Sequence, residues 1–470
     1  MKKTTLQPPV TDESGNRMNE VADSLPISGR DLPPLIREVV QNAPQSRKLA
    51  AFIACLSPLC ALATRIRLKY FYDSRPSALL LQVIIEGNQS TGKSFAADIE
   101  RLIMDSTIKE HDQEQRNMER DYRDLRLRRN VNERLDEEPK TTIRVIPATI
   151  SKTVLVKRAD RYQRILSSPL TFWMFAEELA QVTDAGKQGY SNLRTIMRSA
   201  YDYGSMFGMD FASDNSYSAI VDINICSMFC TTPAVLDEYM NKKAIEGGNI
   251  TRCILCQLHD DLGADGAWFK PYTPEQQEVI DRTLKTIMDD TYTSEGKLQD
   301  EQFLDMGWID FNVRNWCRQR GHEATLSGSM ALDVFRKRSS VSAFRTAALC
   351  YYLYRTGQMP EMKARKLCKR IYLFMADYIL RSLIKRWGKA FEELNAKRMT
   401  GNSTGRDPGI FGMLGDEFSR EELKNLVKEQ GKTTPARMFI YMWTRQGDIT
   451  VIDNDHFRKT EKHRNHDQQL

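Results

Sequence analysis

The sequence lacks any uninterrupted apolar run of the roughly 20 residues that a membrane-spanning helix needs. The nearest approach is the segment 49–63, which is short, contains Pro58 and is followed by Arg65 and Arg67. The N-terminal MKKTTLQPP has no apolar stretch, so no secretory signal is expected. These absences predict a protein that neither spans a membrane nor is exported.

A strong excess of one charge is also missing. The 68 Lys and Arg residues only slightly outnumber the 62 Asp and Glu residues, which gives a net charge of +6. This mild basic excess permits contact with nucleic acid but does not by itself argue for it. The nine cysteines are odd in number and scattered among apolar residues, which predicts reduced core thiols in a cytoplasmic protein. A chain of 470 residues is long enough for two or three domains.

A phosphate-binding motif follows a strand-like apolar run at 79–85. The pattern G-x-x-x-x-G-K-[ST] is matched at every fixed position by Gly87-Asn88-Gln89-Ser90-Thr91-Gly92-Lys93-Ser94. In such a loop the backbone N–H groups converge on phosphate oxygens, the lysine binds the β- and γ-phosphates of ATP, and the serine hydroxyl ligates Mg²⁺. A helix that begins near Lys93 points its positive end at the same anion. The alternative is a chance match, against which the preceding strand and the following helical pattern both argue.

Two acidic residues follow a buried strand. The segment 169–176 is continuously apolar, as in parallel strands covered on both faces, and it leads into Glu177 and Glu178. At the carboxyl edge of a parallel sheet, one of these acids can hold the Mg²⁺ shell while its neighbour orients or deprotonates the attacking water. The alternative is an acidic first turn of a helix over 177–182, which the helix dipole favours. Lys93 upstream favours the catalytic interpretation.

Further strands are predicted over 141–148, 220–230 and 253–258. Thr231 ends the second of these and is placed to contact a γ-phosphate or the attacking water, although a threonine before proline is more often a turn or a helix cap. Arg252 precedes the last strand in a Gly-Gly-x-x-x-Arg sequence, and its ordinary interpretation is a surface charge.

The remaining segments give the domain organisation. We expect a disordered tail at 1–30, a helical collar at 31–75, an ATPase core at 76–262 and a helical lid domain at 263–396. Within the lid, Arg345 lies on a helix that is basic on one side, and it is either a cation for the nucleotide or a snorkelling surface arginine.

Two segments lie outside this plan. A charged helical insertion at 108–138 is either a solvated helix or a DNA-binding arm, and its balance of acids and bases favours the solvated helix. After a flexible linker at 397–409, the order of helix, turn, helix and strand in 410–470 is winged-helix-like and ends in a basic tail. Such modules bind DNA or protein, and the sequence leaves both open.

In this order, the loop GNQSTGKS, the paired acids, the Thr-Thr-Pro tip and the Gly-Gly-x-x-x-Arg sequence give the chain a family resemblance. It resembles the primase–helicase-like P-loop ATPases of bacterial conjugative transposons and prophages over roughly 32–354. Members of that family have a core similar to AAA+ and superfamily 3 helicases. The resemblance implies an α/β fold with about five parallel strands in the order 5-1-4-3-2, and assembly into a ring, expected to be hexameric.

The same resemblance implies residue roles: Lys93 and Ser94 as the Walker A pair, Glu177 and Glu178 as the Walker B acids, Thr231 as sensor 1, Arg252 as an arginine finger that acts on a neighbouring subunit, and Arg345 as a lid arginine. The sequence departs from the family pattern at two places. Glu177 stands where Asp is usual, and the hairpin expected over 205–220 carries Asp210 and Asp214 but no Lys or Arg to attract a phosphate backbone.

The sequence therefore predicts a cytoplasmic ATPase of a mobile genetic element that uses ATP and Mg²⁺, forms a ring, and unwinds or remodels single- or double-stranded DNA. An element-encoded primase or recombination protein is an expected partner, and a membrane is not. The alternative is a nucleotide-gated DNA-binding regulator, or an assembly protein, without unwinding activity.

Overall fold

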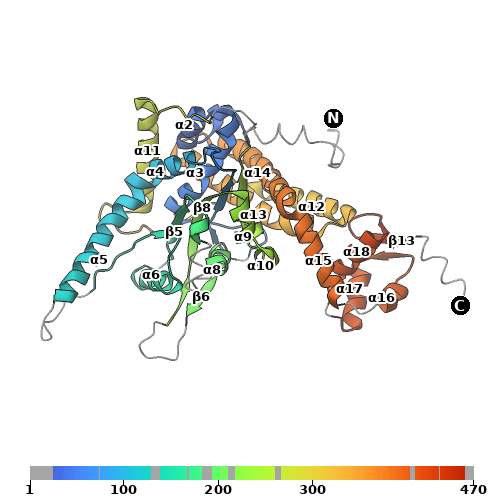
Figure 1. Ribbon diagram of the computed structural model, residues 1–470. Helices are drawn as coiled ribbons and strands as arrows, with labels where there is room; N and C mark the ends of the chain where they lie inside the picture. The colour runs from blue at the N-terminus through green and yellow to red at the C-terminus, as the bar shows by residue number, and fades with distance from the viewer. Residues whose placement is uncertain are drawn as a thin grey trace, which may run out of the picture.

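A five-stranded parallel sheet lies at the centre of the molecule (Figure 1). The structure is a computed structural model that describes residues 25–73, 75–128, 138–166, 169–182, 193–209, 218–259, 266–402, 408–432 and 434–460. The strands lie in the spatial order β4 (Val145–Pro147), β5 (Thr171–Ala176), β8 (Asn224–Thr231), β3 (Gln82–Glu86) and β9 (Cys253–Gln257). Numbered along the chain and taken from the β9 edge, this is the order 5-1-4-3-2. The parallel sheet that the sequence predicts is confirmed.

The sheet is covered on both faces, which explains why its strands read as continuous apolar runs. Every residue of β3 and β8 is buried. Trp173 in β5 donates a hydrogen bond to Glu100 of α4 (Phe95–Met104) at 2.9 Å, and Gln82 in β3 donates to the Met197 carbonyl of α8 (Leu193–Ala200) at 2.7 Å. Trp173 is in register with Cys226 of β8, and Gln82 is in register with Ser227, the next residue of β8. Because successive residues of a strand point to opposite faces, the side chains of Trp173 and Gln82 lie on opposite faces of the sheet. Helices α4 and α8 therefore flank the sheet from opposite sides.

The helices before and after the sheet belong to the same hydrophobic core as the sheet itself. The predicted collar is helical, with α2 (Pro34–Asn42) and the almost fully buried α3 (Lys48–Leu62), which packs across β8, β3 and β5. In the predicted lid region, α14 (Glu361–Leu383) packs on β9 and α13 (Met330–Thr356) contacts α3. The segment 263–396 is helical as predicted, but it shares its core with the sheet.

The other elements of the main body are shorter or more peripheral. They are α6 (Lys152–Ile165), α9 (Pro233–Tyr239), α10 (Lys242–Glu246), α11 (Pro274–Thr291) and α12 (Asp310–Ser327). A small sheet joins β1 (Ile66–Leu68), β2 (Ser77–Ala78) and β10 (Gln302–Phe303), and β6 (Met206–Met209) pairs with β7 (Ala219–Asp222) as the predicted hairpin. The predicted strand 220–230 is divided, because β7 ends one residue before β8 begins. The hairpin tip with Asp210 and Asp214 lies outside the described residues.

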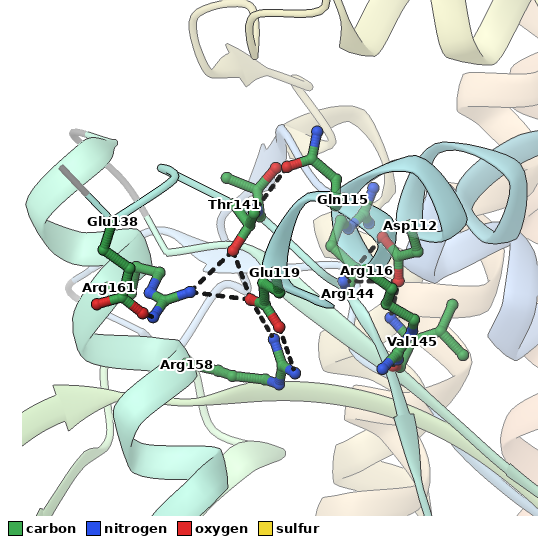
Figure 2. Close-up of polar contacts among 11 residues, drawn as sticks. Asp112, Gln115, Arg116, Glu119, Glu138, Thr141, Arg144, Val145, Arg158 and Arg161 are labelled. Carbon is green, nitrogen blue, oxygen red and sulfur yellow. Dashed lines mark hydrogen bonds and ion pairs between the residues drawn. The ribbon is translucent and has the colours of Figure 1, made fainter. Parts of the chain in front are cut away.

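The charged insertion forms a helix, α5 (Glu110–Arg128), that projects from the body (Figure 1). Its base is fixed by carboxylates, as Figure 2 shows. Asp112 accepts hydrogen bonds from the backbone N–H groups of Arg144 and Val145 at 2.9 and 2.5 Å, which joins α5 to β4. Glu119 accepts from Arg158 and Arg161 of α6 at 3.3 and 2.9 Å. The base of α5 is therefore held by ion pairs and hydrogen bonds.

The C-terminal module, residues 408–460, has a hydrophobic core of its own. It contains α16 (Pro408–Met413), β11 (Glu417–Ser419), α17 (Arg420–Glu429), α18 (Ala436–Gln446), β12 (Ile449–Val451) and β13 (His456–Lys459). Its three strands form an antiparallel sheet in the order β11-β13-β12. The helix–turn–helix followed by a two-stranded hairpin has the order predicted from the sequence.

The predicted linker at 397–409 is wrong for 397–402 and 408–409, which are helical. From α14 the chain continues through a π turn (Ile384–Gly388) into α15 (Lys389–Asn402), and α16 begins at Pro408. Residues 403–407, most of the predicted tail at 1–30 and the basic end at 461–470 lie outside the described residues. Among the helices of the described ranges, none combines the length and apolar character that crossing a bilayer requires. All nine cysteines are buried free thiols, as predicted.

The base of α5 gives a test of its anchoring. Burial alone would raise the pKa of Glu119, but the hydrogen bond from Thr141 and the positive charge of Arg158 hold it below its ordinary value. A carboxylate with a lowered pKa stabilises the fold above its unfolded-state pKa and loses this effect as the pH falls. We expect Glu119→Gln to lower the free energy of unfolding by about 1 kcal/mol at pH 7 and by less below about pH 4.

Urea unfolding at both pH values measures this difference. Glu114→Gln, an exposed glutamate on the same helix, is the matched control. An equal loss in the two variants, or a loss that grows with acid, would contradict the anchoring role.

Candidate functional site

The loop predicted to bind phosphate connects the central strand β3 to helix α4. It curls tightly, with Ser90 and Gly92 in the left-handed region at φ 63° and 69°. A Cβ atom on Gly87 would lie 2.5 Å from the Thr91 hydroxyl oxygen, so glycine is required at this position. In the described part of the chain, the backbone N–H groups of Gly92, Lys93 and Ser94 donate to no other protein group. The loop therefore leaves donors free at the N-terminus of α4, where an anion is favoured.

The side chain of Lys93 folds back onto the first residues of the loop. Its ammonium group donates hydrogen bonds to the carbonyls of Gly87 and Asn88 at 2.9 and 2.6 Å. These contacts hold the two ends of the loop together and keep the positive charge next to the free N–H groups. Ser94 precedes the first residue of α4, is exposed, and makes no capping hydrogen bond with its side chain. Its hydroxyl is available to a ligand.

The two acidic residues lie at the same edge of the sheet as the loop. Glu177 and Glu178 directly follow β5 and are exposed. The backbone beyond them is tied to the neighbouring strand, because the N–H of Leu179 donates to the Cys230 carbonyl at 2.9 Å. Burial raises the pKa of the Cys230 thiol to about 12, with the charge of Lys93 opposing and that of Glu177 adding to the rise. Because β8 lies between β3 and β5, the loop that carries Lys93 and the acids that follow β5 flank the end of β8.

Thr231 lies beside the loop, as predicted. It is in register with Glu86, and its carbonyl accepts a hydrogen bond from the N–H of Gly87 at 3.0 Å. Its hydroxyl donates to the carbonyl of Thr232 at 3.1 Å. The carbonyl of Thr231 thus fixes the start of the loop, while its side chain remains at the tip of β8.

The oxygen atoms near the loop are too few to bind a metal ion such as Mg²⁺ unless a bound phosphate supplies further ligands. The hydroxyl of Ser94 and the carboxylate of Glu177 are oxygen ligands of the kind that Mg²⁺ takes in proteins. Within the described ranges no group of three or more His, Cys, Asp or Glu side chains could hold a metal alone. Mg²⁺ is typically bound by one or two protein ligands together with substrate phosphates and water. The residues therefore fit Mg²⁺ as part of a metal–phosphate complex.

Arg252 lies at the opposite edge of the sheet. It immediately precedes β9, roughly 15 Å along that strand from the edge that carries the loop. Its guanidinium donates to the Gly248 carbonyl and to Asp202, both at 3.0 Å, and Asp202 also pairs with Arg338 at 2.7 Å. Burial alone would raise the pKa of Asp202, but Arg338 and Arg252 hold it below its ordinary value. Arg252 is therefore out of reach of the loop in its own chain.

The expectation for Arg345 is wrong. Its side chain is buried and donates to the carbonyls of Leu80 and Tyr201 at 2.9 and 3.0 Å and to the Ser77 hydroxyl at 3.1 Å. Leu80 precedes β3, about 20 Å along the chain from the loop. Because α13 packs inside the main core, Arg345 satisfies backbone carbonyls at the amino edge of the sheet instead of facing a nucleotide.

An arginine that the sequence did not single out lies beside the loop. Arg386, in the π turn between α14 and α15, pairs with Glu86 at 3.0 Å and with Asp237 at 2.7 Å. Glu86 is the last residue of β3, is 4% exposed, and also accepts from Gln257 at 2.8 Å. The signal in the sequence was Glu86 itself, because a carboxylate at the end of a buried strand requires a partner.

A second such arginine supports the loop from the collar. Arg47 is buried, and its guanidinium donates to the carbonyl of Thr91 at 3.2 Å and to that of His259 at 3.0 Å. It joins the loop to the chain that follows β9. The loop is therefore held from three sides: by its own lysine, by the collar and by β8.

No protein-family model matches the chain, and no curated protein matches it.

The pair of Arg386 and Glu86 gives a second test. Arg386→Met leaves a buried carboxylate with one partner fewer, and we expect the free energy of unfolding to fall by about 3 kcal/mol. Adding Glu86→Gln removes that unpaired charge, so the double variant should lose less than the sum of the two single variants.

A double-mutant cycle by urea unfolding measures this coupling. Arg381→Met, an exposed arginine on α14, is the control for loss of a cation. Strict additivity of the two substitutions would show that the pair is not coupled.

Proposed function

We propose that this chain is a P-loop ATPase that hydrolyses ATP with Mg²⁺ and acts on DNA. The observation that carries the proposal is the meeting of three groups at one sheet edge: a curled loop with free N–H donors, the Lys93 ammonium inside it, and the acid pair that follows β5. The parallel sheet with a glycine-rich loop between a strand and a helix supports the same proposal.

Each residue has a role that follows from its chemistry. The loop N–H groups and Lys93 hold the β- and γ-phosphates, and Ser94 and Glu177 ligate Mg²⁺, which neutralises charge that develops on the phosphates. Glu178 orients the attacking water and accepts its proton. Thr231, at the tip of the adjacent strand, contacts the γ-phosphate or this water.

The location of Arg252 supports assembly into a ring. An arginine at the amino edge of the sheet cannot reach the loop of its own chain, but it can serve the loop of a neighbouring copy. In this proposal Asp202 holds the guanidinium until the neighbour binds. A hexameric ring of this chain, encoded by a mobile element as the resemblance suggests, is the assembly that we propose.

Two uses of hydrolysis remain distinct. In the first, the ring unwinds or remodels DNA. In the second, ATP gates DNA binding by the C-terminal module without unwinding, and the separate core of that module favours this second candidate. A strand-displacement assay distinguishes them, since a regulator binds duplex DNA but releases no strand.

Removing the loop lysine tests nucleotide binding. We expect Lys93→Ala to abolish the rise in melting temperature that ATP and Mg²⁺ cause, because the β- and γ-phosphates lose their cation. Lys285→Ala removes an exposed lysine on α11 and should leave this rise unchanged. A normal rise in the Lys93 variant would remove the loop from the proposal.

Replacing the second acid separates binding from turnover. Glu178→Gln should retain the stabilisation by ATP and Mg²⁺ while its turnover falls by a factor of about 10² or more, because the water loses its base. Hydrolysis measured by phosphate release checks this. Unchanged turnover would exclude Glu178 from the reaction.

Mixing variants tests whether Arg252 acts on a neighbour. Arg252→Ala and Lys93→Ala should each be inactive alone, with a loss of roughly 10³ or more expected for the arginine. A mixture should recover activity, because an intact Arg252 from one subunit meets an intact loop from the other. No recovery, in a mixture that assembles normally, would contradict action between subunits.

A further inference from the structure

The C-terminal module is attached to the main body through polar contacts. Its apolar side chains form a cluster separate from the main core. The contacts that join it to the main body include hydrogen bonds from Tyr441 to Glu392 and from Arg420 to Thr325, and one between His322 and Asn454. Interfaces of this polar kind between units with separate cores permit relative movement.

The orientation of α18 decides which surface of the module is covered. Phe439, Ile440 and Trp443 lie on the face of α18 that enters the module's own core. Tyr441 and Arg445 lie on the opposite face, as the helical period requires. In helix–turn–helix proteins the outer face of the second helix is the surface that enters the major groove of DNA. In this module α18 is that second helix.

On this outer face Tyr441 is covered by the main body, while Arg445 is exposed. Tyr441 is 5% exposed, and its hydroxyl donates to a carboxylate oxygen of Glu392 on α15 at 2.7 Å. Arg445 in turn donates to the Tyr441 hydroxyl oxygen at 2.9 Å. Burial and the neighbouring carboxylate raise the pKa of Tyr441 to about 12, so it remains a donor at neutral pH.

The turn between β12 and β13 faces the same way. Asn454 in this turn contacts His322 of α12, and the Asn454 carbonyl accepts from Arg420 at 2.9 Å. Thr444 packs close to Gly328 at the end of α12, 3.3 Å from where a Cβ would lie. The second helix and the hairpin that follows it are therefore both turned toward α12 and α15.

We propose that Tyr441 and Arg445 form a binding site for the phosphate backbone of duplex DNA, which Glu392 occupies when the module is docked. A hydroxyl donor next to a guanidinium is a common pair of ligands for a backbone phosphate. A carboxylate accepts hydrogen bonds from the same kinds of donor as a phosphate, and Glu392 accepts from one member of this pair, the Tyr441 hydroxyl. DNA and Glu392 compete for one surface, and DNA binding requires the module to swing away from α15.

The test removes the Glu392 carboxylate from α15 and leaves the sequence of the C-terminal module unchanged. Binding of a fluorescein-labelled 20-base-pair duplex is measured by anisotropy at fixed salt and without nucleotide. We expect Glu392→Ala to bind about tenfold tighter than the unmodified chain, because the module no longer gives up a hydrogen bond to a charged group. Adding Arg445→Ala should cancel the gain.

Two further variants keep the test decisive. Glu393→Ala removes the same charge from the exposed neighbouring position and should leave the affinity nearly unchanged. Glu392 also accepts hydrogen bonds from Ser329 and the Ala331 N–H, so its removal takes an acceptor from the start of α13 as well. His322→Ala releases the turn contact from α12 instead, and it should also tighten DNA binding.

The inference rests on the proposed function only in taking DNA as the ligand. An equal gain in the variants at 392 and 393, no gain in the variants at 392 and 322, or a gain that survives Arg445→Ala would overturn it. A chain that hydrolyses ATP but shows one of these results would overturn the competition and leave the ATPase proposal intact.

Discussion

The pairing of β3 with β8 is the interaction on which the rest of the molecule depends. It places the start of the loop against the end of β8, where the N–H of Gly87 bonds to the carbonyl of Thr231. The same strand β8 pairs on its other side with β5, which carries the acids. Because all three strands run parallel, their carboxyl ends meet at one edge. A shift of this register by one residue would turn every side chain of β3 to the wrong face.

The strands of the central sheet and most helices could be predicted because their signals are local. A strand buried on both faces must be apolar throughout, and β5 and β9 were found on that basis. The helices after the sheet follow a 3.6-residue period, and the segment 263–396 is helical as predicted. The loop was predicted from fixed positions that need glycine and lysine for physical reasons. The close approach of Thr91 to Gly87 and the left-handed backbone of Gly92 agree with them.

The arginines could not be assigned, because their partners are distant in the sequence. Arg345 reaches a carbonyl 265 residues away, and Arg386 reaches Glu86 across 300 residues. Nothing in the local pattern of α13 distinguishes a cation that faces a ligand from one that satisfies buried carbonyls. The linker was misjudged for a related reason. Its three glycines and one serine favour a flexible chain, yet α15 continues to Asn402 as an extension of a long helix that packs on the sheet.

That long helix has a geometric consequence. Arg386, which pairs with the residue before the loop, and Glu392, which receives the hydroxyl of Tyr441, are six residues apart on one nearly continuous rod. At 1.5 Å per residue, about 9 Å of helix separates the two contacts. While both contacts hold, this helix connects the end of β3 to the C-terminal module. A rotation of the helix at one contact therefore moves the residues at the other. The π turn at 384–388, which contains Arg386, lies at the point about which the helix would rotate.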